Sequence, residues 1–525
     1  MLSTQSRDFL IPQRRLDEVK NPAQPSRLPH LSLLALAVAA LCLSGCGIKP
    51  TPFTDSELKQ TAQADRTEMF SDQQPVTGPI TLDEAMARAI RYNLDHRLKM
   101  MEEALGQKQL DLSNFDLLPK LTAQAGYTDR NHPLASSSTS LFNPDVTTVP
   151  QSYSSDQSDR TADLGFSWNI LDFGVSYYEA KEQADHVLVL EQRRRKVVQL
   201  MMQQVRESYW QAAGAQRLHD RIEPLLDQAR AALDDSKQVQ KEQLRGPLET
   251  LNYQHELLDI MRQLEVVRDQ LEEANPRLAT LMNLEPGKDF TLAPPDGFGV
   301  PKFDMPMDQM EETALERRPE LVEADYNQRI SVNETHKALA KLLPGIEFEL
   351  GAHYDSNSFL AYQAWRAAGI SVSWNLLNVL NAKNIKGMAD AQLEVAKTQQ
   401  LALSMAVLTQ VHVARTELDA KNRQFDLLKQ LNDVDQQILE HTRNATHADA
   451  QGKLEEIRAA TSAMMSELRL YESYGELEGA YGQLLSTLGL DPVPDTVKSY
   501  DLTALEQAID REQQHWTELG RGGQQ

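Results

Sequence analysis

The sequence has few cysteines, few aromatic residues and little that resembles a compact globular core. Two of its 525 residues are cysteine, and aromatic residues make up 6% of the chain. Long stretches without glycine or proline accompany this composition, which favours extended helices over compact cores. The formal net charge is −23. Because so acidic a chain would repel phosphate groups, we exclude nucleic acid as a partner.

Familiar catalytic and cofactor motifs are also missing. The sequence has no HExxH, no phosphate-binding loop, no Gly-x-Ser-x-Gly and no cysteine pair with metal-ligand spacing. His441 and His447 would point to different faces of a helix, so we expect both to be solvated. The basic run from Arg193 to Lys196 is expected on a solvated helix face or at a rim close to a bilayer. We therefore predict no enzyme, no cofactor and no bound metal.

The main apolar run, from Leu31 to Leu43, follows basic residues and is too short to span a bilayer as a stable helix. This layout is typical of a signal peptide. Leu43-Ser44-Gly45-Cys46 resembles the lipobox of bacterial lipoproteins, in which the cysteine becomes the lipidated first residue of the mature chain.

The lipobox resemblance predicts that residues 1–45 are a lipoprotein signal peptide, and that Cys46 carries the lipid, palmitate included. Residues 46–80 would then be a lipid-anchored linker. After cleavage no second thiol remains, which excludes an intramolecular disulfide. Gly47 stands where lipoproteins of the inner membrane commonly have aspartate, so the resemblance implies delivery to the outer membrane.

The chain is an internal duplication. Ser167-Trp168-Asn169 returns as Ser373-Trp374-Asn375, 206 residues later (374 − 168), and Gly246 and Gly452 are separated by the same interval. Before the tryptophans the interval is 225 (342 − 117), between the two Leu-Leu-Pro motifs. The first copy therefore has 19 extra residues (225 − 206), which fall in a Ser-, Pro- and Asn-rich stretch that predicts a long loop.

The duplication divides the chain into a first repeat at 81–285 and a second repeat at 308–492. A proline-rich linker, 286–307, joins the repeats. Residues 493–525 form a polar C-terminal tail that we expect to be peripheral. Each repeat is predicted to contain a helix, a pair of strands and a long helical hairpin.

The strands are predicted from residues that alternate between apolar and polar. They cover 120–128, 162–171, 345–354 and 368–377, the length that a tilted strand needs to cross a bilayer. The expected lipid-facing residues are Phe166, Trp168, Ile170, Phe348, Val372 and Trp374. An ordinary half-buried sheet gives the same alternation. The export signal, and the lack of an adjacent amphipathic helix to cover the sheet, favour the membrane.

Helices are predicted on both sides of the strands. One covers 81–118, with Thr81 as its N-cap and Glu84 completing a capping box. Much longer helices follow at about 175–243 and 380–448, each reaching about 100 Å at about 1.5 Å per residue. Pro224 should kink the first of them, and return helices are expected near 249–284 and 454–488.

Two coiled-coil seams are predicted on the long helices, because their apolar residues step by three and four positions. The first seam is Leu218, Ile222, Leu225, Ala229 and Ala232, and the second is Leu427, Leu431, Val434, Ile438 and His441.

The stretches TLDEAMARAIRYNLD, LLPKLTAQAGY and LGFSWNILDFG, together with the glycine-centred helix turns, resemble the TolC-type outer-membrane efflux proteins over about residues 80–492. The resemblance implies a mostly α fold with a membrane β-barrel part. Each chain of a homotrimer would give four strands to a twelve-stranded barrel and long helical hairpins to a periplasmic α-barrel. Four strands cannot close a barrel in lipid, so oligomerisation also follows from physics. The residues leave two or three chains open, and the trimer comes from the resemblance.

The resemblance further implies a passive exit duct of a tripartite efflux or type I secretion system. Its partners would be an inner-membrane transporter, a periplasmic adaptor and outer-membrane lipid. Drugs, metal ions and proteins are all left open as cargo. Because the enlarged loop, about 129–160, joins strands whose other ends lead to periplasmic helices, we expect it outside the cell.

A periplasmic aperture at the helix-turn tips is implied as well. In the family a glycine begins the turn, and a carboxylate some six residues later narrows the aperture. After Gly246 and Gly452 these positions hold Asn252 and Arg458, a departure from the acidic ring, and Arg458 would make a cationic one. The nearby carboxylates that would restore negative charge or pair with Arg458 are Glu249, Glu455 and Glu456. Such carboxylates are also ordinary helix caps.

An alternative function is a lipid-anchored periplasmic coiled-coil scaffold or adaptor without a membrane barrel. Its strands would form a small soluble domain, and that domain would have to cover the outward Trp, Phe and Ile side chains.

Overall fold

A computed structural model describes residues 50–139, 142, 147–242, 246–446, 452–493 and 501–521, in two units, Met1–Thr67 and Glu68–Gln525. Cys46 and the predicted signal peptide lie outside the described residues. The predicted linker 46–80 contains a helix, α2 (Asp55–Met69). Thr54 and Glu57 form its capping box, with Thr54 N donating to Glu57 Oε2 at 2.8 Å and Glu57 N to Thr54 Oγ1 at 3.3 Å.

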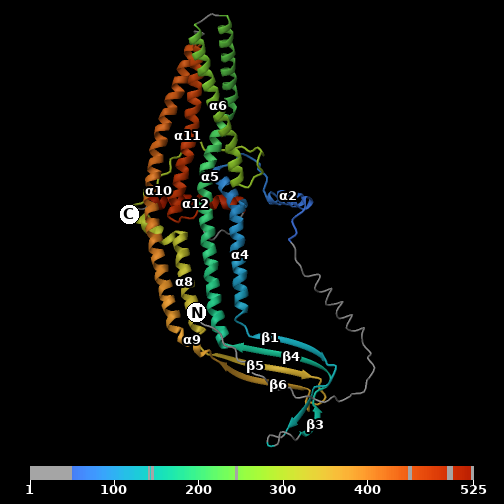
Figure 1. Ribbon diagram of the computed structural model, residues 1–525. Coiled ribbons are helices and arrows are strands. Elements are labelled where there is room, and N and C mark those ends of the chain that lie inside the picture. Colours follow the sequence, from blue (N-terminus) through green and yellow to red (C-terminus); the bar gives the residue numbers. More distant parts are fainter. Residues whose placement is uncertain are drawn as a thin grey trace, which may run out of the picture. The chain divides into compact units, whose positions relative to one another are not determined.

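The second unit contains two copies of one plan (Figure 1). The first copy has α3 (Leu82–Tyr92), α4 (Leu94–Phe115), β1 (Lys120–Asp129), β4 (Ser158–Asn169), α5 (Ile170–Lys241) and α6 (Pro247–Leu281). The second has α7 (Met307–Arg317), α8 (Pro319–Ala340), β5 (Gly345–Asp355), β6 (Ala364–Ser373), α9 (Leu376–Leu380), α10 (Ala382–Thr446) and α11 (Lys453–Thr487). The bounds of α3 and α4 recur in α7 and α8, and those of α6 recur in α11, at the two intervals found in the sequence. The duplication is therefore structural.

The prediction of a single helix over 81–118 is wrong, because the chain forms two helices there, α3 and α4. Thr81 caps α3 by accepting a hydrogen bond from Glu84 N at 3.1 Å. Asn93 then ends α3, and its Oδ1 accepts from the N–H groups of Asp95 and His96 at 3.0 and 3.2 Å. An asparagine side chain competes in this way with the helical backbone bonds. Arg318, followed by Pro319 at the first position of α8, makes the equivalent break in the second copy.

The repeated Ser-Trp-Asn motif is a junction between strand and helix. Asn169 Oδ1 accepts from Leu171 N at 2.9 Å, and Asn375 Oδ1 accepts from Leu377 N at 3.2 Å, so each asparagine caps the helix that follows. The strands predicted at 162–171 and 368–377 therefore end earlier, and β4 and β6 also begin earlier.

Two residues predicted on strands are consequently not in them. Ile170 is the first residue of α5, and Trp374 lies between β6 and α9. Trp374 Nε1 donates to the carbonyl oxygen of Leu342 at 3.0 Å. Alternating polarity could not reveal the end of the strand, since the first helical residues continue the same pattern.

The enlarged loop carries its own hairpin, formed by β2 (Ala135–Thr139) and β3 (Thr147–Tyr153), where the sequence predicted an irregular loop. The end of β3 and the residues that follow it contact the turn between β5 and β6. Asp156 accepts from Ser358 N at 2.5 Å and from Ser358 Oγ at 2.8 Å, and Tyr153 packs edge-on against Phe359 at 5.6 Å. The loops of the two repeats are thus fastened together.

The helices pack mainly through α5, which contacts α4, α6, α8 and α11. The predicted seam on α5 is buried, from Leu218 at 0% exposed to Leu225 at 6%. The predicted seam on α10 is exposed within the chain, with Leu427 at 67% and Val434 at 51%. The residues of α10 that pack inward include Val407, Val411, Ala414, Leu418, Phe425 and Leu439. A heptad stripe identifies a packing surface but not its partner.

The linker between the repeats belongs to the core, although the sequence suggested only a connection. Phe298 of the linker lies 4.8 Å from the ring of Tyr474 and 5.9 Å from that of Trp210. Ile80 forms a parallel β-bridge with Leu292, and Tyr209 donates its hydroxyl to Ile80 O at 3.0 Å. These contacts tie the start of the first repeat to its end.

The C-terminal tail is not peripheral, which corrects the sequence prediction. It forms α12 (Leu502–Arg521), which packs on α3 with Leu505, Ile509 and Trp516 each at most 4% exposed. Gln513 Nε2 donates to Asp83 Oδ1 at 3.1 Å. The polar average of the tail hid an amphipathic helix. Among the described helices, none combines the length and the apolar composition that a membrane-crossing helix requires.

Close approach of α5 and α11 depends on glycine. A Cβ atom at Gly475 would lie 2.9 Å from the carbonyl oxygen of Glu207, and at Gly482 it would lie 3.1 Å from the Cα atom of Gln203. The backbone of α5 thus leaves no room for a side chain at either of these two positions of α11.

We predict that Gly475→Leu destabilises the fold by about 1–3 kcal/mol, because the helices must move apart. Gly174→Ala is the control, since a Cβ there meets nothing within 4 Å. Thermal unfolding in detergent should show a lower Tm for Gly475→Leu and an unchanged or higher Tm for Gly174→Ala. Equal Tm values would contradict the close packing.

Candidate functional site: a two-faced sheet and paired helical tips

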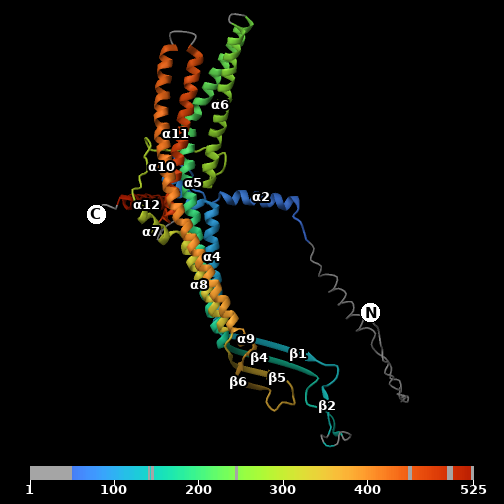
Figure 2. The ribbon, with the colours of Figure 1, turned by 60° about the vertical axis from the view of Figure 1, so that its left-hand side comes forward.

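The four-stranded sheet, in the order β1-β4-β5-β6 (Figure 2), has one apolar face. Residues directly opposite one another in antiparallel strands point to the same side. Phe166 is opposite Leu121 and Leu350, and Phe348 is opposite Trp168 and Ile370. We call this side the apolar face, and its large members are Leu121, Leu164, Phe166, Trp168, Ile346, Phe348, Leu350, Ile370 and Val372. Of the predicted lipid-facing residues, Phe166, Trp168, Phe348 and Val372 lie on it.

The opposite face is polar. Its members include Thr122, Gln124, Asp163, Ser167, Glu347, Glu349 and His353. His353 Nδ1 lies 2.6 Å from Asp163 Oδ1, and the His353 ring stacks on that of Trp365 at 5.3 Å. One side of the sheet therefore suits lipid and the other suits water.

Among the strands that the structure describes, none pairs with the outer side of β1 or of β6. The strands at the edges, β1 and β6, have every residue exposed. Their outward backbone groups need partners that this sheet does not provide. An open edge of this length is a template for pairing with another strand.

Exposed apolar stripes continue this pattern on the helices. On α4, Leu98, Met101 and Leu105 are 54–59% exposed and follow heptad spacing. On α10 the exposed residues of the predicted second seam are Leu427, Leu431, Val434 and Ile438. We call these the α4 stripe and the α10 stripe.

The turns between the long helices and their return helices begin at glycines, as expected. Gly246 is the N-cap of α6 and Gly452 that of α11. Glu249 and Asn252 are exposed in the first turns of α6. A cleft of about 390 Å³ lies between the ends of α5, α6 and α11, and both Glu249 and Asn252 line it.

Arg458 does not stand alone at the tip. Its guanidinium pairs with Glu455 at 2.7 Å and with Glu256 of α6. The sequence identified Glu455 as a partner but missed Glu256, which lies about 200 residues away and meets Arg458 only because α6 and α11 converge. Glu456 instead pairs with Arg443 at 3.8 Å. Within one chain the charge of Arg458 is therefore balanced.

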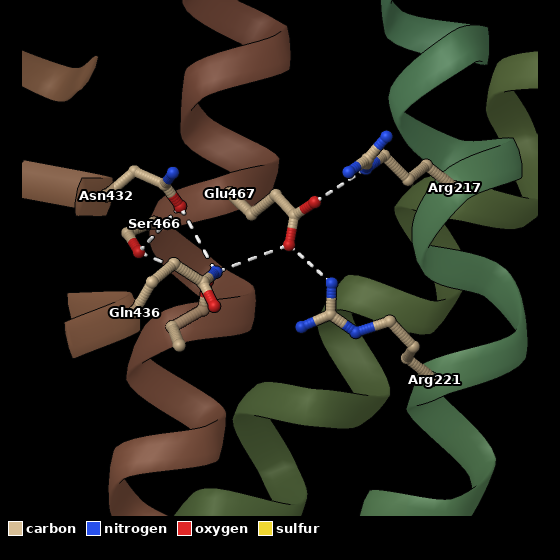
Figure 3. A network of polar contacts seen from close by, with 7 residues as sticks. Arg217, Arg221, Asn432, Gln436, Ser466 and Glu467 are labelled. Atoms are coloured by element: carbon tan, nitrogen blue, oxygen red, sulfur yellow. Dashed lines mark hydrogen bonds and ion pairs between the residues drawn. The ribbon is translucent and has the colours of Figure 1, made fainter. Parts of the chain in front are cut away.

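A buried network farther from the tips joins three helices around Glu467 of α11 (Figure 3). This side chain is 9% exposed; it accepts from Arg217 Nε of α5 at 2.9 Å and also from Arg221. From α10, Gln436 Nε2 donates to it at 3.4 Å. The hydrogen bond to Glu467 raises the pKa of Arg217. A second buried pair, Arg206 and Glu478 at 2.8 Å, also links α5 to α11.

The basic run on α5 forms ion pairs, which the sequence prediction of a solvated face did not include; Arg193 and Lys196 are exposed as predicted, and Arg194 and Arg195 are partly buried. Arg194 pairs with Glu103 of α4 at 2.7 Å, and Arg195 pairs with Asp491 at 2.6 Å. The first and last residues of the run form ion pairs with α8. Arg193 pairs with Glu323 at 2.8 Å, and Lys196 pairs with Glu320 at 3.0 Å. Sequence reasoning missed these partners because they lie on other elements.

The structure describes one of the two histidines singled out in the sequence. His441 is exposed, and His447 lies outside the described residues. Within the described ranges no group of three or more His, Cys, Asp or Glu residues is placed to hold a metal ion.

The comparisons with known proteins agree with this architecture. Residues 96–284 match the family described as outer membrane efflux protein. No curated protein sequence matches the chain significantly. Among solved structures, the Campylobacter jejuni outer-membrane channel CmeC is 12% identical, with a TM-score of 0.61 over 89% of this chain and 97% of that one. The outer-membrane channel OprN is 17% identical, with a TM-score of 0.60 over 78% and 89%.

The open state of the Neisseria gonorrhoeae outer-membrane channel MtrE is also similar, at 17% identity and a TM-score of 0.55 over 78% of this chain and 88% of that one. The resemblance to TolC-type outer-membrane efflux proteins is thereby confirmed, and the chain has their fold. All three of these solved structures are described as outer-membrane channels.

The Glu467 network yields an asymmetric prediction. Replacing Arg217 and Arg221 together by Gln leaves a buried carboxylate without its cations and should destabilise the fold by about 3 kcal/mol. Glu467→Gln leaves two arginines that are 65% and 42% exposed and can be hydrated, so the cost should be about 1 kcal/mol.

Chemical denaturation in detergent would compare the two variants with Lys237→Gln as the control. Lys237 forms an exposed i, i+3 pair with Asp234 on the same helix, so its replacement should change the free energy of unfolding by less than about 1 kcal/mol. Equal losses for the Arg pair and for Glu467 would mean that the carboxylate is not effectively buried.

Proposed function

We propose that the chain is the outer-membrane channel-tunnel of a tripartite efflux or type I secretion system. It acts as a passive exit duct and works as a homotrimer with a periplasmic adaptor and an inner-membrane transporter. The observation that carries the proposal is the four-stranded sheet with one apolar face, one polar face and two open edges.

The sheet supports the barrel for a physical reason. In hydrocarbon every backbone N–H and C=O must be paired, so a sheet can cross the membrane only when it is closed. Joining β6 of one copy to β1 of the next closes it without any other protein. Three copies give twelve strands, with the apolar face toward lipid and the polar face, including Asp163 and Glu349, toward the lumen.

The helices support the same assembly. The α4 stripe and the α10 stripe are each too apolar to face water in a stable assembly, and they lie on different repeats. In a ring of copies, the first repeat of one chain meets the second repeat of its neighbour. A neighbouring copy would then cover both stripes, the α4 stripe nearer the sheet and the α10 stripe nearer the helical tips, in the wall of a periplasmic α-barrel.

The tips would surround the periplasmic aperture. Gly246 and Gly452 form the turns, and Glu249, Asn252, Glu455, Glu456 and Arg458 line the surfaces beside them. Because Arg458 is paired with Glu455 and Glu256, the aperture would not carry a bare cationic ring. A mixed ring of ion pairs takes its place.

The lipid on Cys46 would add a second attachment to the outer membrane. Each buried methylene of an acyl chain contributes about 0.8 kcal/mol, so the anchor is substantial. The barrel would nevertheless insert through its own apolar belt. The enlarged loop with its β2–β3 hairpin would lie outside the cell.

The alternative, a lipid-anchored periplasmic coiled-coil scaffold, is less well supported. It would leave Ile370, Val372 and Leu121 exposed to water at 67–69%. Among the described helices, the start of α5 contacts this face, where Phe173 packs edge-on against Trp168 at 6.0 Å, and it leaves these three residues uncovered.

Membrane fractionation and conductance test the proposal. The protein should be recovered from the outer membrane as a detergent-dependent, heat-modifiable oligomer and should conduct ions in planar bilayers. Recovery as a soluble periplasmic monomer would support the scaffold and reject the duct.

The stripes predict the effect of charge on assembly. Leu98→Glu with Leu105→Glu should convert most of the oligomer to monomer, because burying an unpaired charge costs several kcal/mol. Gln107→Glu, on another face of α4, should assemble normally. Crosslinking in detergent measures both, and an unchanged oligomer in the double variant would exclude the α4 stripe from the interface.

Loss of the lipid should be tolerated. A variant with a non-lipoprotein signal peptide and Cys46→Ser should still insert and form trimers, because the barrel places itself in the membrane. If this variant is soluble in the periplasm, the lipid is the sole anchor and the barrel proposal fails.

A further inference from the structure

Two arginines interrupt the apolar face at equivalent positions of the repeats. Arg160 and Arg366 are 206 residues apart (366 − 160), and each stands eight residues before the tryptophan of a Ser-Trp-Asn motif (168 − 160 and 374 − 366). The duplicated pattern therefore contains a cation as well as an aromatic residue.

The strand register places both arginines on the apolar face. Arg160 is opposite Tyr127 on β1, which is an even number of residues from Leu121. Arg366 is opposite Ala352 on β5, and Ala352 is opposite Leu164. Both arginines are exposed, and within the described chain neither forms an ion pair. This differs from the run at Arg193 to Lys196, where each cation has a carboxylate.

Charged groups on the lipid side of a barrel are tolerated only at its borders. An arginine there costs about 2–4 kcal/mol at the midplane of the bilayer and about 0–1 kcal/mol near the interfaces. Eight strand residues at about 3.4 Å each span about 27 Å, or about 20 Å across the membrane for a strand tilted by about 40°. If Trp168 marks the border next to the helices, Arg160 reaches the opposite border.

Other residues at that end fit an interface with lipid headgroups. Tyr127 and Tyr354 lie on the same face and are 66% and 44% exposed, as in the aromatic girdles of membrane barrels. The carboxylate on this face, Asp129 at the end of β1, accepts from Ser158 Oγ at 2.6 Å. The face thus ends in tyrosines, one carboxylate that is hydrogen-bonded to a serine, and two guanidinium groups that form no ion pair among the described residues.

We propose that Arg160 and Arg366 bind the phosphate groups of anionic lipid in the outer leaflet. The inference rests on the proposed barrel, in which three copies would present six such arginines as a ring at one height. The planar guanidinium donates two parallel hydrogen bonds to phosphate oxygens, which an ammonium group does not. The ring would select phosphorylated lipid for the layer around the barrel and fix the barrel's depth.

The test uses the full-length trimer in phosphatidylcholine vesicles, with and without a phosphorylated anionic glycolipid. Wild type and the variant Arg130→Gln should bind the glycolipid alike, because Arg130 follows the last residue of β1 and lies outside the sheet. Arg160→Gln with Arg366→Gln should bind it at least about tenfold more weakly, as expected for lost charge-assisted hydrogen bonds. Inorganic phosphate should not compete.

Equal binding by wild type and the double Gln variant would overturn the proposal, as would effective competition by inorganic phosphate, which would indicate a site for the free ion. If the double Gln variant does not insert, Arg160→Lys with Arg366→Lys keeps the charge and removes the planar fork; intermediate binding supports the proposal and wild-type binding contradicts it. Absence of any membrane oligomer for wild type would instead reject the proposed function itself.

Discussion

The hydrogen-bonding requirement of the two open sheet edges is the constraint on which the rest of the structure depends. The strands β1 and β6 each present one side of backbone groups without a partner in the sheet. In the membrane location that we propose, no water satisfies these groups, so the edges would have to pair with those of neighbouring copies. The proposed oligomer, its apolar outside and its polar lumen would all follow from that single requirement, given the alternation of side chains along the strands.

The helices extend this arrangement away from the sheet without a break. α5 runs from the Asn169 cap at the end of β4 to the tip of the hairpin as one helix of 72 residues. Ion pairs of Arg193 to Lys196, the pair Arg206–Glu478 and the Glu467 network hold it at successive levels to α4, α8, α10 and α11. The polar contacts of α5 therefore reach elements of both repeats along its length.

Most of the architecture could be predicted from the sequence, because the pattern of each element occurs in both repeats and each copy supports the assignment of the other. The strand pairs, the long helices and the glycine turns come from local patterns of period 2 or 3.6. Local patterns did not predict where an asparagine side chain caps a helix and so sets its start, as at Asn93 and Asn169. They also missed α12, because the tail is polar on average although one side of this helix is apolar. They also failed for partners distant in sequence, such as Glu256 for Arg458 and Glu467 for Arg217. Spacing shows which residues share a face, but only the fold decides what covers that face.

Disulfide crosslinking of the two sheet edges tests the central claim most directly. In a background with Cys46→Ser and a non-lipoprotein signal peptide, one cysteine would replace Thr122 of β1 and a second would be moved along β6. Within one chain these strands are three spacings apart, about 14 Å, which is too far for a disulfide. The account predicts bonds between chains at alternate positions of β6, giving a ladder that ends at three chains. A ladder ending at two chains, an open-ended series, or no crosslink at any position would contradict it.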